Sequence, residues 1–287
     1  MTPAVRHCTS SDGLSLHALD WAPAPYAPRR IDVLCLAGLT RHARDFDDVA
    51  ARLAARGHRV FCPDLRGRGR SDYARDPATY SPPQYFDDLR AQCVAARLDA
   101  FAVVGTSFGG LLAMALASVM AGSVRGIAMN DIGPEVATEG ARRILDYISV
   151  DRPAADWAAA ASELRALLPD VLADDPQGWA KLVRNTYREA SDGRLHFDWD
   201  VRLSAGLRPG PDPEIDLWAL WRGTARVPVL VVRGGKSDVL SAPTLAKMRA
   251  SRRDLAVLEL PGLGHAPTLD EPAARDAIDA WLARIET

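Results

Sequence analysis

Short apolar runs alternate with stretches of helical spacing through most of the chain. The apolar runs are continuous rather than alternating, which is typical of strands buried on both faces of a parallel sheet. The pattern therefore predicts an α/β fold with helices on both sides of a mostly parallel, twisted sheet. The predicted strands are 14–22, 31–38, 58–64, 101–105, 124–131, 227–235 and 255–262. The predicted helices are 46–57, 82–98, 108–120, 242–250 and 272–285.

The segment 133–225 departs from this alternation. It is rich in alanine at helical spacing, as in "PAADWAAAASELRALLPDVL" and "PQGWAKLVRNTYREA", and holds five of the seven tryptophans. A turn at Asp192-Gly193 precedes the extended stretch "RLHFDWDVRL". We predict that 133–225 is a mostly helical cap, inserted into an α/β core formed by 1–132 and 226–287.

Composition narrows the class of protein. The net charge of −2 argues against binding to nucleic acid or to an anionic membrane, since both need a basic face. The four cysteines form no C-x-x-C pair, which argues against a zinc ribbon or a redox pair. The first residues lack the apolar core of a signal peptide, and no run is long enough to span a membrane. We expect a cytoplasmic protein that acts on a small molecule; the sequence leaves a homodimer open.

A serine lies between two glycines at the junction of a predicted strand and a predicted helix. The stretch Gly105-Thr106-Ser107-Phe108-Gly109 fits G-x-S-x-G, and its strand–turn–helix context gives that pattern its weight. A β-carbon at either glycine would clash in so sharp a turn. The turn would present the hydroxyl of Ser107 above the carboxyl end of the sheet, which predicts a nucleophile.

A serine nucleophile requires a base and an acid that orients the base. His265 is the candidate base, because it lies in a glycine-rich loop between the last strand and the last helix. Asp238 and Asp131 both follow predicted strands, so either could be the acid. We favour Asp238, since a glycine pair lets its loop bend inward, whereas Asp131 lies where the chain leaves the sheet for the cap.

The backbone N–H groups of Leu39 and Phe108 are candidate donors to an oxyanion. Gly38 ends a strand and allows a close turn, and Phe108 opens the helix after Ser107, where the helix dipole favours negative charge. These two N–H groups are predicted to meet beside the serine.

Other residues are candidates for contact with substrate. Arg41 lies close to the predicted oxyanion loop and could meet a carboxylate, and Trp157 and Trp199 of the cap could line an apolar pocket. The arginines of "PDLRGRGRSD" (63–72) resemble a phosphate patch, but the glycines and the position after a strand favour a structural turn.

The pieces "LAGLTRHARDF", "PDLRGRGRSD", "GTSFGG", "NDIGPE", "RGGKSDVLS" and "PGLGHAPTLDEP" together resemble the α/β-hydrolase superfamily, in its capped branch with a serine nucleophile. The serine argues against the branches with an aspartate nucleophile, the dehalogenases and epoxide hydrolases. The resemblance implies a triad that needs neither metal nor cofactor and cleaves a small carboxylic ester or lactone. The alternatives are hydrolysis of an amide or carbon–carbon bond, or a small-molecule receptor with little turnover.

Overall fold

The computed structural model describes residues 1–168, 170–172, 175–207 and 215–287. Its main sheet has the strand order β1-β2-β4-β3-β5-β6-β9-β10. The pairs β1–β2 and β2–β4 are antiparallel, and the other neighbouring pairs are parallel, which confirms the prediction of a mostly parallel sheet. The strands are β1 Ala4–Thr9, β2 Ser15–Trp21, β3 Asp32–Leu36, β4 Val60–Pro63, β5 Phe101–Thr106, β6 Val124–Asn130, β9 Val229–Gly234 and β10 Ala256–Leu260.

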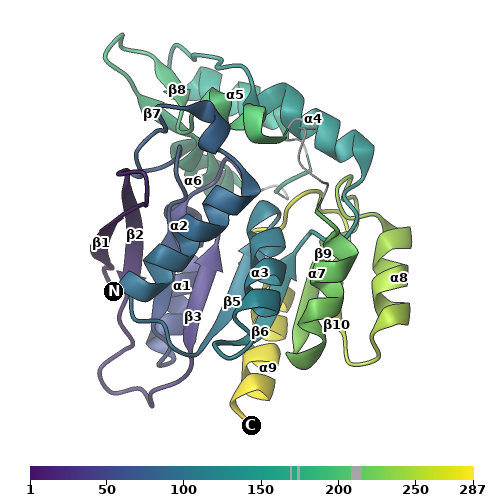
Figure 1. Ribbon diagram of the computed structural model, residues 1–287. Coiled ribbons are helices and arrows are strands. Elements are labelled where there is room, and N and C mark those ends of the chain that lie inside the picture. Colours follow the sequence, from purple (N-terminus) through teal and green to yellow (C-terminus); the bar gives the residue numbers. More distant parts are fainter. Residues whose placement is uncertain (169, 173–174, 208–214) are drawn as a thin grey trace.

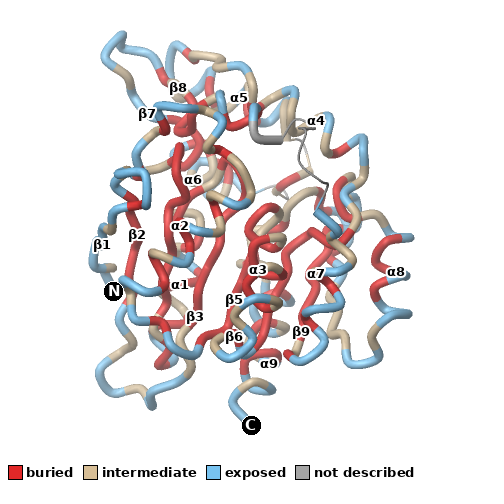
Figure 2. The backbone as a smooth tube through the Cα atoms, in the orientation of Figure 1, coloured by how far each residue is buried: buried red, intermediate tan, exposed pale blue. Residues whose placement is uncertain are grey.

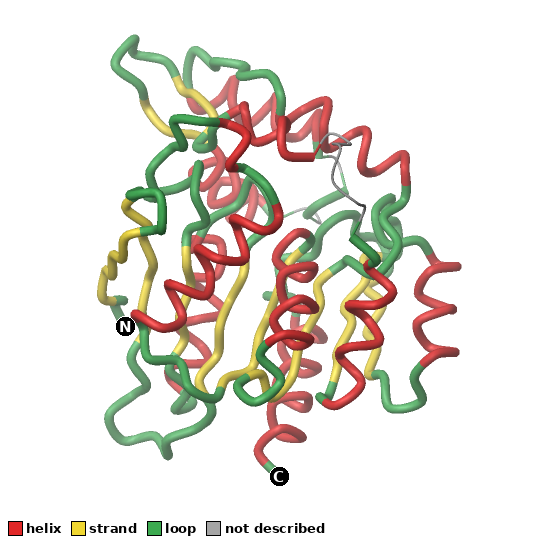
Figure 3. Tube along the Cα trace, in the orientation of Figure 1, coloured by secondary structure: helices red, strands yellow, loops and turns green. Residues whose placement is uncertain are grey.

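Helices cover both faces of the sheet (Figure 3). Successive side chains of a strand point to opposite faces, so Leu34 and Leu36 of β3 join one apolar core while Val33 and Cys35 join the other. The first core is closed by α2, α3, α7 and α8, and the second by α1 and α9. These helices are α1 Asp47–Ala55, α2 Pro82–Ala95, α3 Phe108–Val119, α7 Leu217–Gly223, α8 Ala242–Ser251 and α9 Pro272–Glu286.

The central strands are buried along their length (Figure 2). This explains their continuous apolar runs, because a strand covered on both faces has no solvated side for polar residues. Among the described helices, none is both long and apolar enough to cross a membrane.

The segment between β6 and β9 contributes to two layers. Helices α4 to α6 and the hairpin β7–β8 gather over one end of the sheet (Figure 1). Helix α7 instead packs on α3, where the Ser118 hydroxyl donates to the carbonyl of Leu220 at 3.1 Å. From here on, the cap means residues 138–207. Its elements are α4 Thr138–Ile148, α5 Trp157–Leu167, α6 Pro176–Thr186, β7 Tyr187–Glu189 and β8 Leu195–Phe197.

One predicted helix of the cap ends early. The stretch "TYREA" has helical spacing, but α6 ends at Thr186 and residues 187–189 form β7, paired antiparallel with β8. The Tyr187 and Phe197 rings lie 5.0 Å apart across this pair. The predicted turn at Asp192-Gly193 joins the two strands, with Gly193 at a φ of 77°. The cross-strand aromatic contact thus outweighs the local helical preference.

The two glycines of the serine motif are required by close backbone packing. A β-carbon on Gly105 would lie 2.4 Å from the carbonyl oxygen of Gly109, and one on Gly109 would lie 2.1 Å from that of Leu36. Both neighbours are backbone atoms of regular elements, so neither can move away cheaply.

We therefore expect Gly109→Ala to lower the free energy of unfolding by about 3 kcal/mol, since overpacking a rigid site costs this much. Gly122→Ala is the matched control, because no atom lies within 4 Å of the added β-carbon; it should change stability by less than about 0.5 kcal/mol. Chemical denaturation of both variants measures the difference. Equal stabilities would contradict the packing argument.

Candidate active site

Ser107 occupies a strained turn between β5 and α3. Its φ of 52° and ψ of −118° are unusual for a residue with a side chain. The Ser107 N–H donates to the carbonyl of Asn130 at the end of β6, at 2.9 Å, which holds the turn against the neighbouring strand. The predicted strand–turn–helix context of this serine is therefore present.

His265 contacts both Ser107 and an aspartate. Its Nε2 lies 2.8 Å from the Ser107 Oγ, and its Nδ1 lies 2.8 Å from Oδ2 of Asp131. An ionised carboxylate only accepts hydrogen bonds, so Nδ1 carries the proton and Nε2 accepts from the serine hydroxyl. The His265 side chain is 9% exposed and that of Asp131 is fully buried.

The preference for Asp238 as the partner of His265 is wrong. Asp238 instead forms a two-point ion pair with Arg143 of α4, at 2.5 and 2.9 Å. Partial burial raises the pKa of Asp238, but the Arg143 guanidinium outweighs this and holds that pKa below its ordinary value. Asp238 is therefore bonded to a cap residue that is distant in the sequence, and Asp131 is the carboxylate that contacts His265.

Asp131 is fixed to β9 by two hydrogen bonds. Its N–H donates to the carbonyl of Val232 at 2.7 Å, and its Oδ1 accepts from the N–H of Gly234 at 2.8 Å. Asp131 thus anchors the end of β6 through backbone bonds, as its place before the chain leaves the sheet indicated. Its second oxygen remains available to His265.

Asn130 is a site residue that the sequence analysis missed. Its amide Nδ2 donates to the carbonyl of Pro267 at 2.7 Å and to the Thr106 hydroxyl at 3.1 Å, so it ties the His265 loop to β5 and β6. The only signal was its position beside Asp131 at the end of a predicted strand.

Leu39 and Phe108 flank the serine from two elements. Phe108 is the first residue of α3, so its N–H has no acceptor within the helix. Leu39 follows Gly38, and a β-carbon added to Gly38 would lie 3.7 Å from the β-carbon of Ser107. Gly38, and with it the start of the loop that carries Leu39, therefore lies beside the serine turn.

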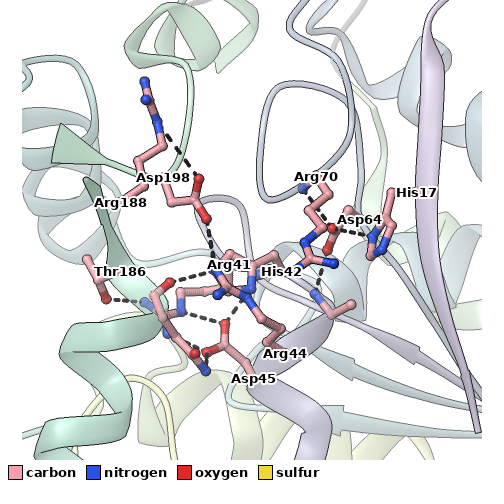
Figure 4. A network of polar contacts seen from close by, with 12 residues as sticks. His17, Arg41, His42, Arg44, Asp45, Asp64, Arg70, Thr186, Arg188 and Asp198 are labelled. Atoms are coloured by element: carbon pink, nitrogen blue, oxygen red, sulfur yellow. Dashed lines mark hydrogen bonds and ion pairs between the residues drawn. The ribbon is translucent and has the colours of Figure 1, made fainter. Parts of the chain in front are cut away.

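Arg41 is engaged by protein groups in this structure (Figure 4). Its Nε and Nη2 donate to Asp45 at 2.8 and 2.5 Å, and its Nη1 donates to the hydroxyl of Thr186 in the cap at 2.6 Å. Burial raises the pKa of Asp45, but Arg41 and His42 lower it below its ordinary value. Arg41 thus links the loop after β3 to the cap, and each of its nitrogens has an acceptor.

The same loop is attached to the cap at further points. Arg44 donates to Asp198 at 2.9 Å, and the His42 ring lies 2.6 Å from the carbonyl of Asn185. Figure 4 shows these side chains converging between the loop and the cap strands. The loop that carries Leu39 is therefore fixed by the cap as well as by the sheet.

The two predicted pocket tryptophans lie within the cap. Trp199 is only 3% exposed, stacks on Phe197 at 4.1 Å and donates from Nε1 to the carbonyl of Ile148. The guanidinium of Arg184 covers the Trp157 ring at 3.8 Å. With so little exposed area, Trp199 belongs to the core of the cap and offers no surface to an open pocket.

Helix α4 crosses above the serine. The Tyr147 hydroxyl lies 3.2 Å from the Thr40 hydroxyl in the loop after β3, while Arg143, one turn earlier, pairs with Asp238 in the loop after β9. Strands β5 and β6 lie between β3 and β9 in the sheet. A helix that joins these two loops must therefore pass over the ends of β5 and β6, where the serine turn and Asp131 lie.

The chain is similar to several known hydrolases. A 3-hydroxybutyrate-oligomer hydrolase from Cupriavidus necator is 34% identical over 275 residues, covering 93% of this chain and 92% of that protein. A 2-(acetamidomethylene)succinate hydrolase from Mesorhizobium japonicum is 26% identical over 254 residues, covering 85% and 86% of the two chains. The crystal structure of an alpha/beta hydrolase from Novosphingobium aromaticivorans superposes with a TM-score of 0.90 at 44% identity, covering 99% of each chain.

The family model described as the alpha/beta hydrolase family matches residues 33–275, a range that runs from β3 into α9. It includes the serine turn, the histidine loop and the whole cap. The contacts of Ser107, His265 and Asp131, the strand order and these matches lead to one conclusion: the chain belongs to the alpha/beta hydrolase family.

Proposed function

We propose that this hydrolase is a serine esterase in which Ser107 is the nucleophile, His265 the general base and Asp131 the orienting acid. The observation that carries the proposal is the unbroken chain of contacts from the serine hydroxyl to the buried carboxylate, each 2.8 Å long. Such a chain is the arrangement that activates a serine hydroxyl for attack on a carbonyl carbon.

In the first half of the reaction, the Ser107 oxygen bonds to the ester carbonyl carbon as its proton moves to Nε2 of His265. The carbonyl oxygen becomes an oxyanion that accepts from the N–H groups of Leu39 and Phe108. The buried carboxylate of Asp131 stabilises the resulting imidazolium through Nδ1. His265 then returns the proton to the leaving alcohol as the C–O bond breaks, which leaves an acyl group on Ser107.

In the second half, a water molecule replaces the alcohol. It gives one proton to His265 and bonds to the acyl carbon, which forms a second oxyanion in the same position. The bond to Ser107 then breaks, and the serine oxygen recovers its proton from His265. The products are a carboxylic acid and an alcohol, and the enzyme returns to its initial state.

Esters of short hydroxy acids are the substrate class that we favour. The Cupriavidus relative is named for hydrolysis of 3-hydroxybutyrate oligomers and matches this chain over nearly its whole length. Such oligomers are esters that end in a free carboxylate, so an enzyme for them benefits from a cation near the ester site.

Arg143 is suited to that carboxylate. Its Nε and Nη2 bond to Asp238, while Nη1 has no acceptor among the residues that the structure describes. Its side chain is 34% exposed and lies on α4, the helix that crosses above Ser107. Arg41, in contrast, has an acceptor at each nitrogen. Arg143, which is more exposed than Arg41 (20%) and has two N–H groups on Nη1 without an acceptor in the described part of the chain, is therefore the arginine that we favour for an anionic ligand.

Turnover and labelling test the reaction. We expect the protein to hydrolyse p-nitrophenyl butyrate and 3-hydroxybutyrate dimers faster than the matching anilide or a diketo acid. A fluorophosphonate probe should label Ser107, and Ser107→Ala should lose about 10³-fold or more in kcat. Preference for the anilide or the diketo acid would indicate amide or carbon–carbon hydrolysis. Labelling without turnover of any of these compounds would indicate a receptor.

Substitution of the two aspartates tests the acid. Asp131→Asn should lower kcat by up to about 10⁴-fold, because the amide can donate to Nδ1 and favour the wrong histidine tautomer. Asp238→Asn should lower it by less than about tenfold, since a partly exposed ion pair contributes only about 1 kcal/mol. Circular dichroism checks that both variants fold. An inactive Asp238→Asn variant together with an active Asp131→Asn variant would identify Asp238, and not Asp131, as the orienting acid.

Arg143→Gln tests the substrate class. Loss of a charged hydrogen bond should raise KM for a 3-hydroxybutyrate dimer by about tenfold or more, while KM for the uncharged methyl ester of that dimer stays within about twofold of wild type. Arg142→Gln, on the exposed side of the same helix, is the matched control and should change neither value. An equal rise in KM for dimer and methyl ester would refute carboxylate recognition by Arg143.

A further inference from the structure

Two arginines of the loop after β4 are fully buried, but only one is neutralised. Arg66 bonds to both oxygens of Asp88, at 2.5 and 2.7 Å, and to those of Asp12. Arg68 has no carboxylate partner among the described residues. Asp64 is nearby, but its oxygens accept from His17 and from two backbone N–H groups. A buried, unpaired guanidinium is costly, so its position requires an explanation.

The Arg68 guanidinium bonds to backbone carbonyls. Its Nη1 donates to the carbonyl of Leu39, and its Nε and Nη2 donate to the carbonyl of Arg66, each at 3.3 Å. Burial lowers the pKa of Arg68, yet an arginine keeps its proton at any physiological pH. A permanent positive charge is therefore fixed against the residue whose N–H is a proposed oxyanion donor.

The bond from Arg68 completes the fixation of Leu39. On one side, the carbonyl of Gly38 accepts from the N–H of Arg41 at 3.0 Å, which holds the peptide group containing the Leu39 N–H. On the other side, the Leu39 carbonyl accepts from Arg68. With both flanking peptide groups bonded, the Leu39 N–H cannot change direction without the loss of a hydrogen bond.

Arg68 also reaches the second proposed donor through one aromatic ring. The guanidinium carbon lies 4.8 Å from the centroid of the Tyr85 ring, on α2. That ring meets the Phe108 ring edge to face, with centroids 5.2 Å apart and planes at 72°. Phe108 begins α3 with its own N–H beside Ser107. One side chain therefore touches Leu39 directly and Phe108 through Tyr85.

We propose that Arg68 is a positioning residue for the oxyanion site, which sets the Leu39 and Phe108 N–H groups relative to each other and adds positive charge behind them. This inference rests on the proposed serine mechanism. It predicts that loss of Arg68 affects the transition state, in which the oxyanion exists, more than the bound ester, in which it does not.

The experiment compares Arg68→Met and Arg68→Lys with Arg66→Lys, whose side chain still pairs with Asp88. For folded Arg68→Met, we expect kcat on p-nitrophenyl butyrate to fall about 10–100-fold, while KM stays within about twofold of wild type. This fall in kcat is smaller than that expected when an oxyanion donor is removed, because both N–H groups remain. Arg68→Lys keeps the charge but not the planar fork and should fall about three- to tenfold. Arg66→Lys should lower Tm with kcat near wild type.

A second readout separates positioning from general structural damage. A trifluoromethyl ketone forms a tetrahedral oxyanion with Ser107, whereas the corresponding alcohol only occupies the site. The Arg68 variants should bind the ketone more weakly by the factor lost in kcat and bind the alcohol as wild type does. Equal losses for ketone and alcohol would show a structural role and overturn the proposal.

The outcomes also separate this inference from the proposed function. A wild-type protein without ester turnover would contradict the serine esterase itself. An active wild type with unchanged kcat in folded Arg68 variants would overturn only the role of Arg68. If Arg68→Met does not fold, the same two measurements, kcat with KM and binding of the ketone against the alcohol, are made on Arg68→Lys and test the proposal.

Discussion

The tight contact between the serine turn and the end of β3 is the constraint on which the site depends. Gly109 packs against the carbonyl of Leu36 so closely that a β-carbon has no space, and Ser107 accepts an unusual backbone conformation in consequence. Because β3, β5 and β6 are neighbours in the sheet, Leu39, Ser107 and Asp131 lie together at the carboxyl ends of these strands. The hydrolase chemistry follows from strand order rather than from any local cluster in the sequence.

Charged side chains then fix the loops that the sheet alone leaves loose. Arg41 and Arg44 attach the loop after β3 to the cap, and Arg143 attaches α4 to the loop after β9. Each of these cations has a carboxylate partner, as the cost of desolvation requires. Arg68 lacks one in the described part of the chain and bonds instead to the carbonyls of Arg66 and of Leu39, a proposed oxyanion donor. Arg68 therefore differs from these three arginines in bonding to backbone carbonyls where they bond to carboxylates.

The G-x-S-x-G motif predicted the serine turn. Hydrophobic periodicity predicted seven strands of the main sheet and the helices α1, α2, α3, α8 and α9, because continuous buried strands leave a strong pattern, but it missed the exposed strand β1 and assigned α7, which packs on α3, to the cap. It could not distinguish Asp131 from Asp238. Both follow adjacent strands, and the partner of each lies far away in the chain: Arg143 is 95 residues from Asp238, and His265 is 134 residues from Asp131. Residues 187–189 show another limit, since strand pairing within a hairpin overrides the local helical pattern there. The sequence places Arg68 in a structural turn and does not reveal its contacts with Leu39 and Tyr85, which lie elsewhere in the chain.

The loop after β4 also forms backbone hydrogen bonds with the cap. The N–H of Asp200 donates to the carbonyl of Gly67 at 2.8 Å, and the N–H of Gly69 donates to the carbonyl of Asp198 at 3.2 Å. This pairing limits where segments can be exchanged between related proteins. A chimera that takes its cap from a second parent, with crossovers at the two ends of the cap, can change the backbone near 198–200. It would then lose the hydrogen bonds to Gly67 and Gly69, which lie outside the exchanged segment. If 64–72 is transferred together with the cap, both hydrogen-bonded segments come from the same parent.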